Sequence, residues 1–138
     1  MILWNADLTR RLSCSEREKA LLPALIGELL ELCDSVKAEG MKSPALPGEQ
    51  SRSPFLAYGL RLIAEGITTD ALEEILAVYL ATSTLWGYEF LKQCVCAEAL
   101  LSLAAGDTRD IMLRKLAPYA GAQAATGLLD SLGSGNGL

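Results

Sequence analysis

The sequence predicts an all-α protein, a bundle of four to six helices around one long, very apolar central helix. Apolar residues recur at steps of three and four, capping residues precede these runs, and the period-two alternation typical of strands is absent. The chain has 138 residues, which is the length of one ordinary domain. We expect a single helical domain over residues 1–132 and a flexible, glycine-rich C-terminal tail at 133–138.

The first predicted helix runs from about residue 15 to residue 39. Ser15 and Glu18 have the spacing of a capping box, and Gly40 is typical of a helix end. Pro23 lies inside the pattern, so it either kinks the helix or marks its true start near residue 23. The apolar face of this helix consists of Leu22, Leu25, Leu29, Leu32 and Val36.

A loop and a second helix follow. Prolines, serines and a glycine over residues 42–53 predict a mobile internal loop. Ser53 is a good helix cap and Pro54 suits the first helical turn, so the second helix should run from there to Gly66. Residues 68–70 offer the next cap, where Asp70 and Glu73 resemble another capping box.

The central helix is predicted from about residue 72 to residue 103, and only Gly87 interrupts its pattern. Three charged residues occur between positions 75 and 105. A helix this apolar must be covered on most sides, either by the rest of the bundle or by a second copy of the chain. Residues 106–108 should end it, and two shorter helices should follow around residues 111–116 and 120–132.

The composition excludes several classes of protein. Hydrophobic residues make up 51% and charged residues 21%, which is not the composition of a disordered chain. The absence of histidine removes the Ser-His-Asp and Cys-His arrangements and histidine-containing zinc sites. A net charge of -5 argues against a nucleic-acid-binding surface. The side chains of Glu73 and Glu74 diverge by about 100° on a helix, so they cannot face one reacting bond. Together with the exclusions above, this predicts a non-enzymatic protein without a cofactor.

The four cysteines do not suggest a metal site. Cys94 and Cys96 are two residues apart, and such positions point to nearly opposite sides of a helix, so they cannot chelate one ion. Cys33 and Cys94 lie on apolar helix faces, where a free cysteine behaves as a small hydrophobe. This usage indicates a reducing cytoplasm. The longest uncharged runs, 75–88 and 116–129, are shorter than the roughly 20 residues that a membrane span needs, so we expect no transmembrane segment.

Two motifs in the middle of the chain are characteristic. Residues 53–66 read SPFLAYGLRLIAEG and residues 69–76 read TDALEEIL. This order of an apolar helix, a turn and the acidic start of a long helix resembles the cytoplasmic region of MotA, a flagellar stator subunit of the MotA/TolQ/ExbB proton-channel family. Residues 29–41 are similar to the preceding helix of that family, and residues 117–121 (APYAG) are similar to the opening of its third membrane helix. The family's four membrane helices have no counterpart here, so ion conduction is not implied.

The resemblance also suggests contact residues. In the family, the cytoplasmic loop touches the rotor through a basic residue three before a motif glycine and an acidic residue five after it. The basic position matches Lys37, whereas the acidic position falls on Ala45, which cannot form an ion pair. The candidate partner-binding residues are Lys37, Arg61 of the matched motif, and Trp86 and Phe90 of the predicted central helix.

These observations favour a non-enzymatic helical interaction module. We expect it to form a homo-oligomer or to dock on a flagellar motor or membrane-transport component, in the cytoplasm and peripheral to the inner membrane where a partner holds it. The alternative is a small-ligand-binding regulatory domain, with an apolar pocket lined by Trp86, Phe90 and Met112. An enzyme is the third possibility, and only the presence of carboxylates supports it.

Overall fold

The computed structural model describes residues 6–39 and 53–132, and every regular element in these ranges is a helix. The predicted all-α class is therefore confirmed. The predicted tail and most of the predicted loop, including Gly40 and Ala45, lie outside the described residues. The elements in chain order are α1 (Ala6–Arg11), α2 (Glu16–Lys19), α3 (Leu22–Glu39), α5 (Pro54–Ala64), α6 (Thr69–Ala81), α7 (Gly87–Ala104), α8 (Arg109–Leu116), the 3-10 turn η1 (Ala117–Ala120) and α9 (Ala122–Leu132).

The helix starts follow the capping signals of the sequence. Ser15 and Glu18 form the predicted capping box at α2. Ser53 accepts a hydrogen bond from the backbone N–H of Leu56 and caps α5. Thr68 caps α6 through the N–H of Ala71, so the predicted pairing of Asp70 with Glu73 as a capping box is wrong. Side-chain oxygens at these positions satisfy amide groups that have no partner inside the helix.

The first predicted helix is divided into two. The backbone N–H groups of Ala20 and Leu21 bond to the carbonyls of Glu16 and Glu18, which ends α2 after one turn. A new helix, α3, then begins at Leu22 and continues to Glu39. Pro23 thus lies in the first turn of α3, where its missing N–H has no helical partner to lose. This confirms the interpretation in which the proline marks the true start.

The predicted long central helix is also wrong. Residues 82–86 form a turn between α6 and α7, so the described residues contain more helices than the four to six predicted. The Thr82 hydroxyl donates to the Val78 carbonyl and the Ser83 hydroxyl accepts from the N–H of Leu85, which gives the backbone an alternative to the helix. Gly87 has a φ of +64°, a conformation that other residues rarely adopt.

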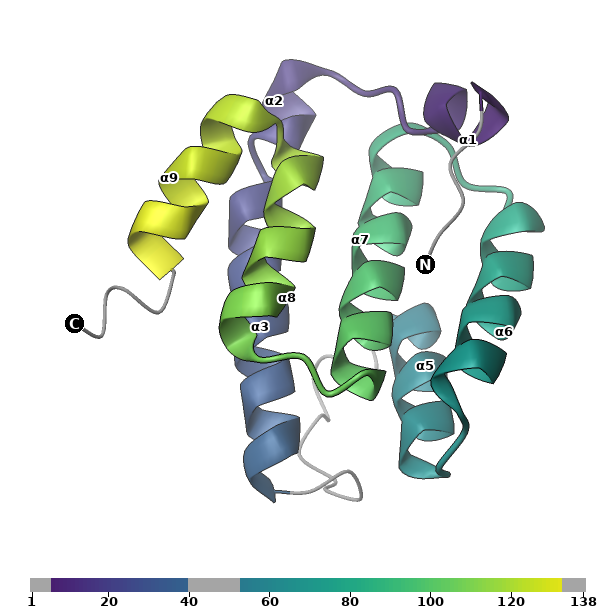
Figure 1. Cartoon of the computed structure of the whole chain (residues 1–138). Coiled ribbons are helices and arrows are strands. Elements are labelled where there is room, and N and C mark those ends of the chain that lie inside the picture. Colours follow the sequence, from purple (N-terminus) through teal and green to yellow (C-terminus); the bar gives the residue numbers. More distant parts are fainter. Residues whose placement is uncertain (1–5, 40–52, 133–138) are drawn as a thin grey trace.

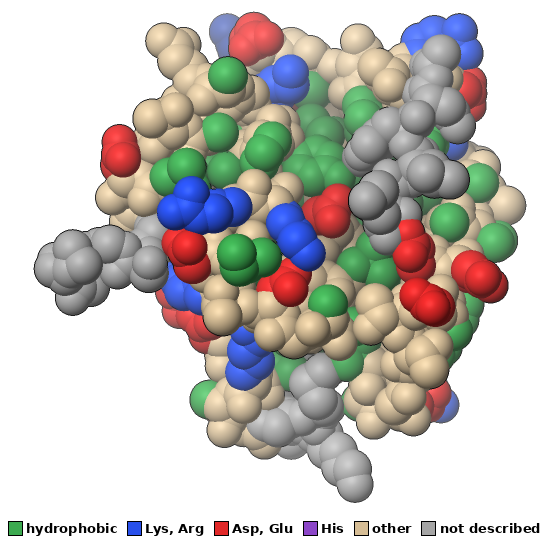
Figure 2. Space-filling view, viewed as in Figure 1, with side chains coloured by type: hydrophobic (Ala, Val, Ile, Leu, Met, Phe, Trp, Pro, Cys, Tyr) green, Lys and Arg blue, Asp and Glu red, His purple; other side chains and the backbone are tan. Residues whose placement is uncertain are grey.

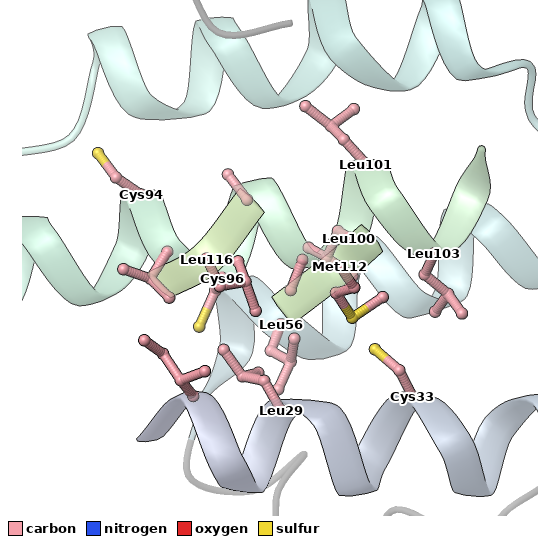
Figure 3. Close-up of a cluster of buried hydrophobic side chains, with 14 of the residues drawn as sticks. Leu29, Cys33, Leu56, Cys94, Cys96, Leu100, Leu101, Leu103, Met112 and Leu116 are labelled. Carbon is pink, nitrogen blue, oxygen red and sulfur yellow. The ribbon is translucent and has the colours of Figure 1, made fainter. Parts of the chain in front are cut away.

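Helix α7 takes the central position that was predicted for the longer helix. Figure 1 shows α7 with α3 and α8 on one side and α5 and α6 on the other, and α7 packs against each of them. Its residues enter the buried core together with Leu29 and Cys33 of α3 and Met112 and Leu116 of α8 (Figure 3). Helix α6 lies at the outer edge of the bundle (Figure 1).

Helices α5 and α7 approach each other closely at Gly59. A Cβ atom on this glycine would lie 2.3 Å from the Leu100 Cδ1 atom of α7, a distance that real Cβ atoms do not tolerate. The missing side chain therefore lets Leu100 fill the space over α5, and Leu100 is almost completely buried. The contact fixes α5, and with it Tyr58 and Phe55, beside α6.

Candidate functional site

The four residues predicted to bind a partner do not form one site. Lys37, near the end of α3, donates from Nζ to the backbone carbonyl of Asp107. Arg61 on α5 is exposed and pairs with Glu65 through Nε at 2.9 Å. Trp86 is 58% exposed in the turn before α7, whereas Phe90 is fully buried. The expectation that Trp86 lies inside a covered central helix is therefore wrong, because the helix is broken at that turn.

Trp86 and Phe90 share a contact with Arg11, a residue that the sequence did not single out. The Arg11 guanidinium lies 3.9 Å from the centre of the Phe90 ring and 5.7 Å from that of Trp86. Its NH1 and NH2 groups donate to the backbone carbonyls of Leu80, Ser83 and Leu85 at 3.3, 2.6 and 3.2 Å. Arg11 is 94% buried, since only 6% of it is exposed. It closes the C-terminal end of α6, where carbonyls lack helical partners and a positive charge is favoured.

The predicted ligand pocket is not formed by the residues that were assigned to it. Phe90 and Met112 belong to the core, and each is at most 1% exposed. Trp86 stands outside this core, so the three side chains do not enclose a common space. The groove described below uses other residues.

Apolar surface is exposed along α6. This helix buries only Leu72, Leu76 and Leu80, which form one narrow stripe at four-residue spacing. The rest of its apolar side chains lie beside the groove between α5 and α6 or face outward, and Val78 is 62% exposed. We define the α6 face as Tyr58, Ile75, Val78, Tyr79 and Thr82.

The α6 face surrounds an open groove of about 600 Å³ that also touches Glu74 and Ser83. Tyr79 lines the groove, and its ring packs edge-on against Phe55 with 4.7 Å between ring centres and lies 5.9 Å from the Tyr58 ring. Among the residues that the structure describes, Glu74 is the one charged side chain that lines the groove. The arrangement offers apolar contact rather than chemistry at a reacting bond.

The cationic groups around α8 form ion pairs within the chain. Arg109 reaches Asp34 and Lys115 contacts Asp107, while Arg114 pairs with Asp110 at 3.0 Å. Figure 2 shows this side of the molecule with positive and negative side chains interspersed and hydrophobic atoms between them. The first pair joins α8 to α3, and the second joins α8 to the turn before it. The three pairs occupy cations that could otherwise meet an anionic ligand.

Asp107 stabilises the end of α7. Its carboxylate accepts hydrogen bonds from the Ser102 hydroxyl at 2.6 Å and from Lys115 Nζ. Partial burial raises the pKa of this carboxyl, but the hydrogen bonds from Lys115 and Ser102 and the nearby ammonium groups outweigh it and lower the pKa below the ordinary 3.8. The charged form of Asp107 is therefore the one that the fold favours.

Three of the four cysteines, Cys33, Cys94 and Cys96, are buried in places that suit packing rather than nucleophilic chemistry. Cys94 and Cys96 point to opposite sides of α7 (Figure 3). Burial raises the pKa of Cys33 to about 11 and that of both Cys94 and Cys96 to about 12, so all three are neutral thiols at pH 7. Among the described residues, no group of three or more histidine, cysteine or acidic side chains is placed to hold a metal ion.

Comparisons with known proteins add no further assignment. No family model, curated protein or solved structure matches the chain. Within residues 6–39 and 53–132, none of the helices combines the length and hydrophobicity needed to cross a bilayer.

Proposed function

We propose that the chain is a non-enzymatic helical interaction module that pairs with a second copy of itself through the α6 face. The exposed apolar surface of α6 is the observation that carries this proposal. Val78 and Tyr58 are 62% and 42% exposed, and they line a groove whose described lining residues include one charged side chain, Glu74. Contiguous apolar surface of this kind is typical of protein contacts.

The sizes of the side chains favour a second copy of the chain. If two α6 helices cross antiparallel with Val78 at the two-fold axis, Ile75 of one copy faces Ala81 and Thr82 of the other. A large side chain thus meets small ones on both sides of the axis, as interdigitated helices require. One surface serves both copies, which is the property of a two-fold interface.

The charges of α6 favour the same orientation. Its three acidic residues, Asp70, Glu73 and Glu74, lie in the N-terminal half, and no charged residue occurs from position 75 to its end at Ala81. An antiparallel pair keeps the carboxylates of the two copies at opposite ends, whereas a parallel pair would bring them together. The contact uses essentially one helix per copy, so we expect a concentration-dependent monomer–dimer equilibrium rather than a permanent dimer.

The resemblance to the stator's cytoplasmic region supports a wider role. In this proposal the dimer docks in the cytoplasm on a motility or membrane-transport component and lies at the inner membrane only through that partner. Lys37 and Arg61 belong to the motifs that carry the resemblance, and both side chains are exposed. They would contribute to that second contact, away from the α6 face.

Sedimentation or light scattering of the full chain over a range of concentrations tests the dimer. We expect the average mass to rise from that of the 14.7 kDa monomer towards twice that value. Val78→Glu should keep the chain monomeric, because two carboxylates would meet at the axis. Ile111→Glu is the matched control, since Ile111 is 43% exposed on α8, and it should leave the equilibrium unchanged. A wild-type chain that stays monomeric at millimolar concentration contradicts the proposal.

A further inference from the structure

The buried cation at the end of α6 has no carboxylate partner among the residues that the structure describes. Three backbone carbonyls and the faces of two aromatic rings surround the Arg11 guanidinium, and these groups carry only partial charges. The end of a helix contributes about half a negative charge, so the full charge of Arg11 more than offsets it. The C-terminal end of α6 is therefore a place where an additional carboxylate would be stabilised.

Ser83 connects this charge to the α6 groove. Its carbonyl accepts the shortest of the three Arg11 hydrogen bonds, at 2.6 Å, and the residue also lines the groove. The Ser83 hydroxyl accepts from the N–H of Leu85, but within the described part of the chain it donates its own proton to no acceptor. A hydroxyl can accept and donate at the same time, so one donor remains available beside the groove.

Glu74 is an unpaired acceptor that lines the same groove towards the other end of α6. Its side chain is exposed, and within residues 6–39 and 53–132 it forms neither an ion pair nor a hydrogen bond. Pairing of two α6 faces would remove water from this carboxylate, which is unfavourable unless a donor replaces the water. Nine positions, about 14 Å along a helix, separate Glu74 from Ser83, so the two side chains cannot meet within one copy.

We propose that Glu74 of each copy accepts a hydrogen bond from the Ser83 hydroxyl of the other copy, and that this contact selects the antiparallel register of the dimer. The inference rests on the dimer of the α6 face proposed above. With Val78 at the two-fold axis, the position four residues before it faces those four and five residues after it in the other copy. Glu74 then lies against Thr82 and Ser83 of the other copy, at the helix end that Arg11 makes positive. The two-fold axis makes the contact occur twice.

The dissociation constant of the dimer tests the contact, measured by sedimentation equilibrium of the full chain and its variants. Glu74→Gln should raise this constant about tenfold, because each dimer loses two charged hydrogen bonds. A carboxylate that is buried without a donor would give the opposite sign, since its removal would tighten the dimer. Glu28→Gln on α3 is the matched control. It removes a carboxylate that has no partner in the described ranges either, but away from the α6 face, and should leave the constant unchanged.

A double-mutant cycle separates the contact from the structure of the turn. Ser83→Ala also removes the acceptor of the Leu85 N–H, so this variant alone can weaken the dimer through the turn. That loss is the same with glutamate or glutamine at position 74, whereas the charged hydrogen bond needs the glutamate. We therefore expect Ser83→Ala to raise the dissociation constant about tenfold in the wild-type background and at most about threefold in Glu74→Gln.

The outcomes distinguish this inference from the proposed dimer itself. Independent effects of the two substitutions, or a dissociation constant that is unchanged or lower in Glu74→Gln, would overturn the contact between Glu74 and Ser83. If Val78→Glu still prevents association in that case, the dimer of the α6 face stands without this contact. A wild-type chain that stays monomeric overturns both.

Discussion

Helices α6 and α7 have similar apolar sequences but different surroundings. Helix α7 buries 11 of its 18 residues, whereas α6 buries three of its 13. The difference follows from position, because α7 has neighbours on both sides and α6 lies at the edge of the bundle (Figure 1). Apolar composition therefore identifies a helix that needs cover, but it does not say whether the same chain supplies that cover.

The largest contrast between the two helices should appear when one side chain of each is truncated. Phe90→Ala in α7 should lower the free energy of unfolding by about 3–5 kcal/mol, because it leaves a cavity in a fully packed core. It also removes the ring beneath the Arg11 guanidinium. Val78→Ala in α6 should change the same quantity by less than about 0.5 kcal/mol in the monomer, since most of its surface stays in water.

Urea unfolding at low protein concentration measures both values without a contribution from association. A loss for Val78→Ala that equals the loss for Phe90→Ala would show that α6 is covered in the monomer. In that case the distinction between the two helices would fail, and the α6 face would lose its interpretation as an interface.

The end of α6 provides the next test, because Arg11 holds it from outside the helix. Arg11→Met should cost about 2 kcal/mol, since the carbonyls of Leu80, Ser83 and Leu85 would lose charged hydrogen-bond donors while the apolar stem is kept. The stability of Arg11→Lys should lie between that of the wild type and that of Arg11→Met, because an ammonium group cannot reach all three carbonyl acceptors. The protection of the α6 amides against hydrogen exchange should fall in the same order.

If the α6 amides in Arg11→Met instead stay protected against hydrogen exchange, the turn at residues 82–86 keeps its structure without the Arg11 hydrogen bonds. The helix end would then depend on the Thr82 and Ser83 hydroxyls alone. Thr82→Ala and Ser83→Ala would separate these contributions.

Local signals of the sequence predicted the fold class and most helix starts, whereas contacts between distant segments were missed. Ser15, Ser53 and Pro54 act within one helical turn, so their spacing alone shows where helices begin. Arg11 bonds to residues that lie 69 to 74 positions further along the chain, and no sequence period connects such partners.

The break between α6 and α7 did leave a signal in the sequence. Three consecutive hydroxyl residues, Thr82 to Thr84, precede Gly87, and this combination is typical of a turn. The uninterrupted apolar pattern on either side outweighed it. The α6 groove could not be predicted from the pattern, because it depends on how α5 and α6 are placed beside each other in space.

The contact between α5 and α7 sharpens the comparison further, since α5 packs on α7 on the same side as α6. Gly59→Ala should lower the free energy of unfolding by about 1–3 kcal/mol, because the new methyl group would overlap Leu100. Gly127→Ala in α9 is the matched control. It has no atom within 4 Å of the new methyl group, so it should raise stability by about 0.5–1 kcal/mol. Thermal unfolding of both variants checks the opposite signs, and a stabilised Gly59→Ala would contradict the close packing of α5 on α7.

The smallest expected effect concerns the end of α7, which Asp107 holds where Arg11 holds the end of α6. Because the pKa of Asp107 is lower in the folded chain than its ordinary 3.8, its contribution is present above about pH 4 and is lost as the pH falls through the folded value. Asp107→Asn should lower stability at pH 7 by less than about 1 kcal/mol and should reduce the loss of stability below pH 4. Urea unfolding at pH 7 and pH 3 measures both. If Asp107→Asn loses as much stability as the wild type between pH 7 and pH 3, other carboxylates cause the acid sensitivity. The titration of Asp107 would then not contribute to the stability of the α7 end.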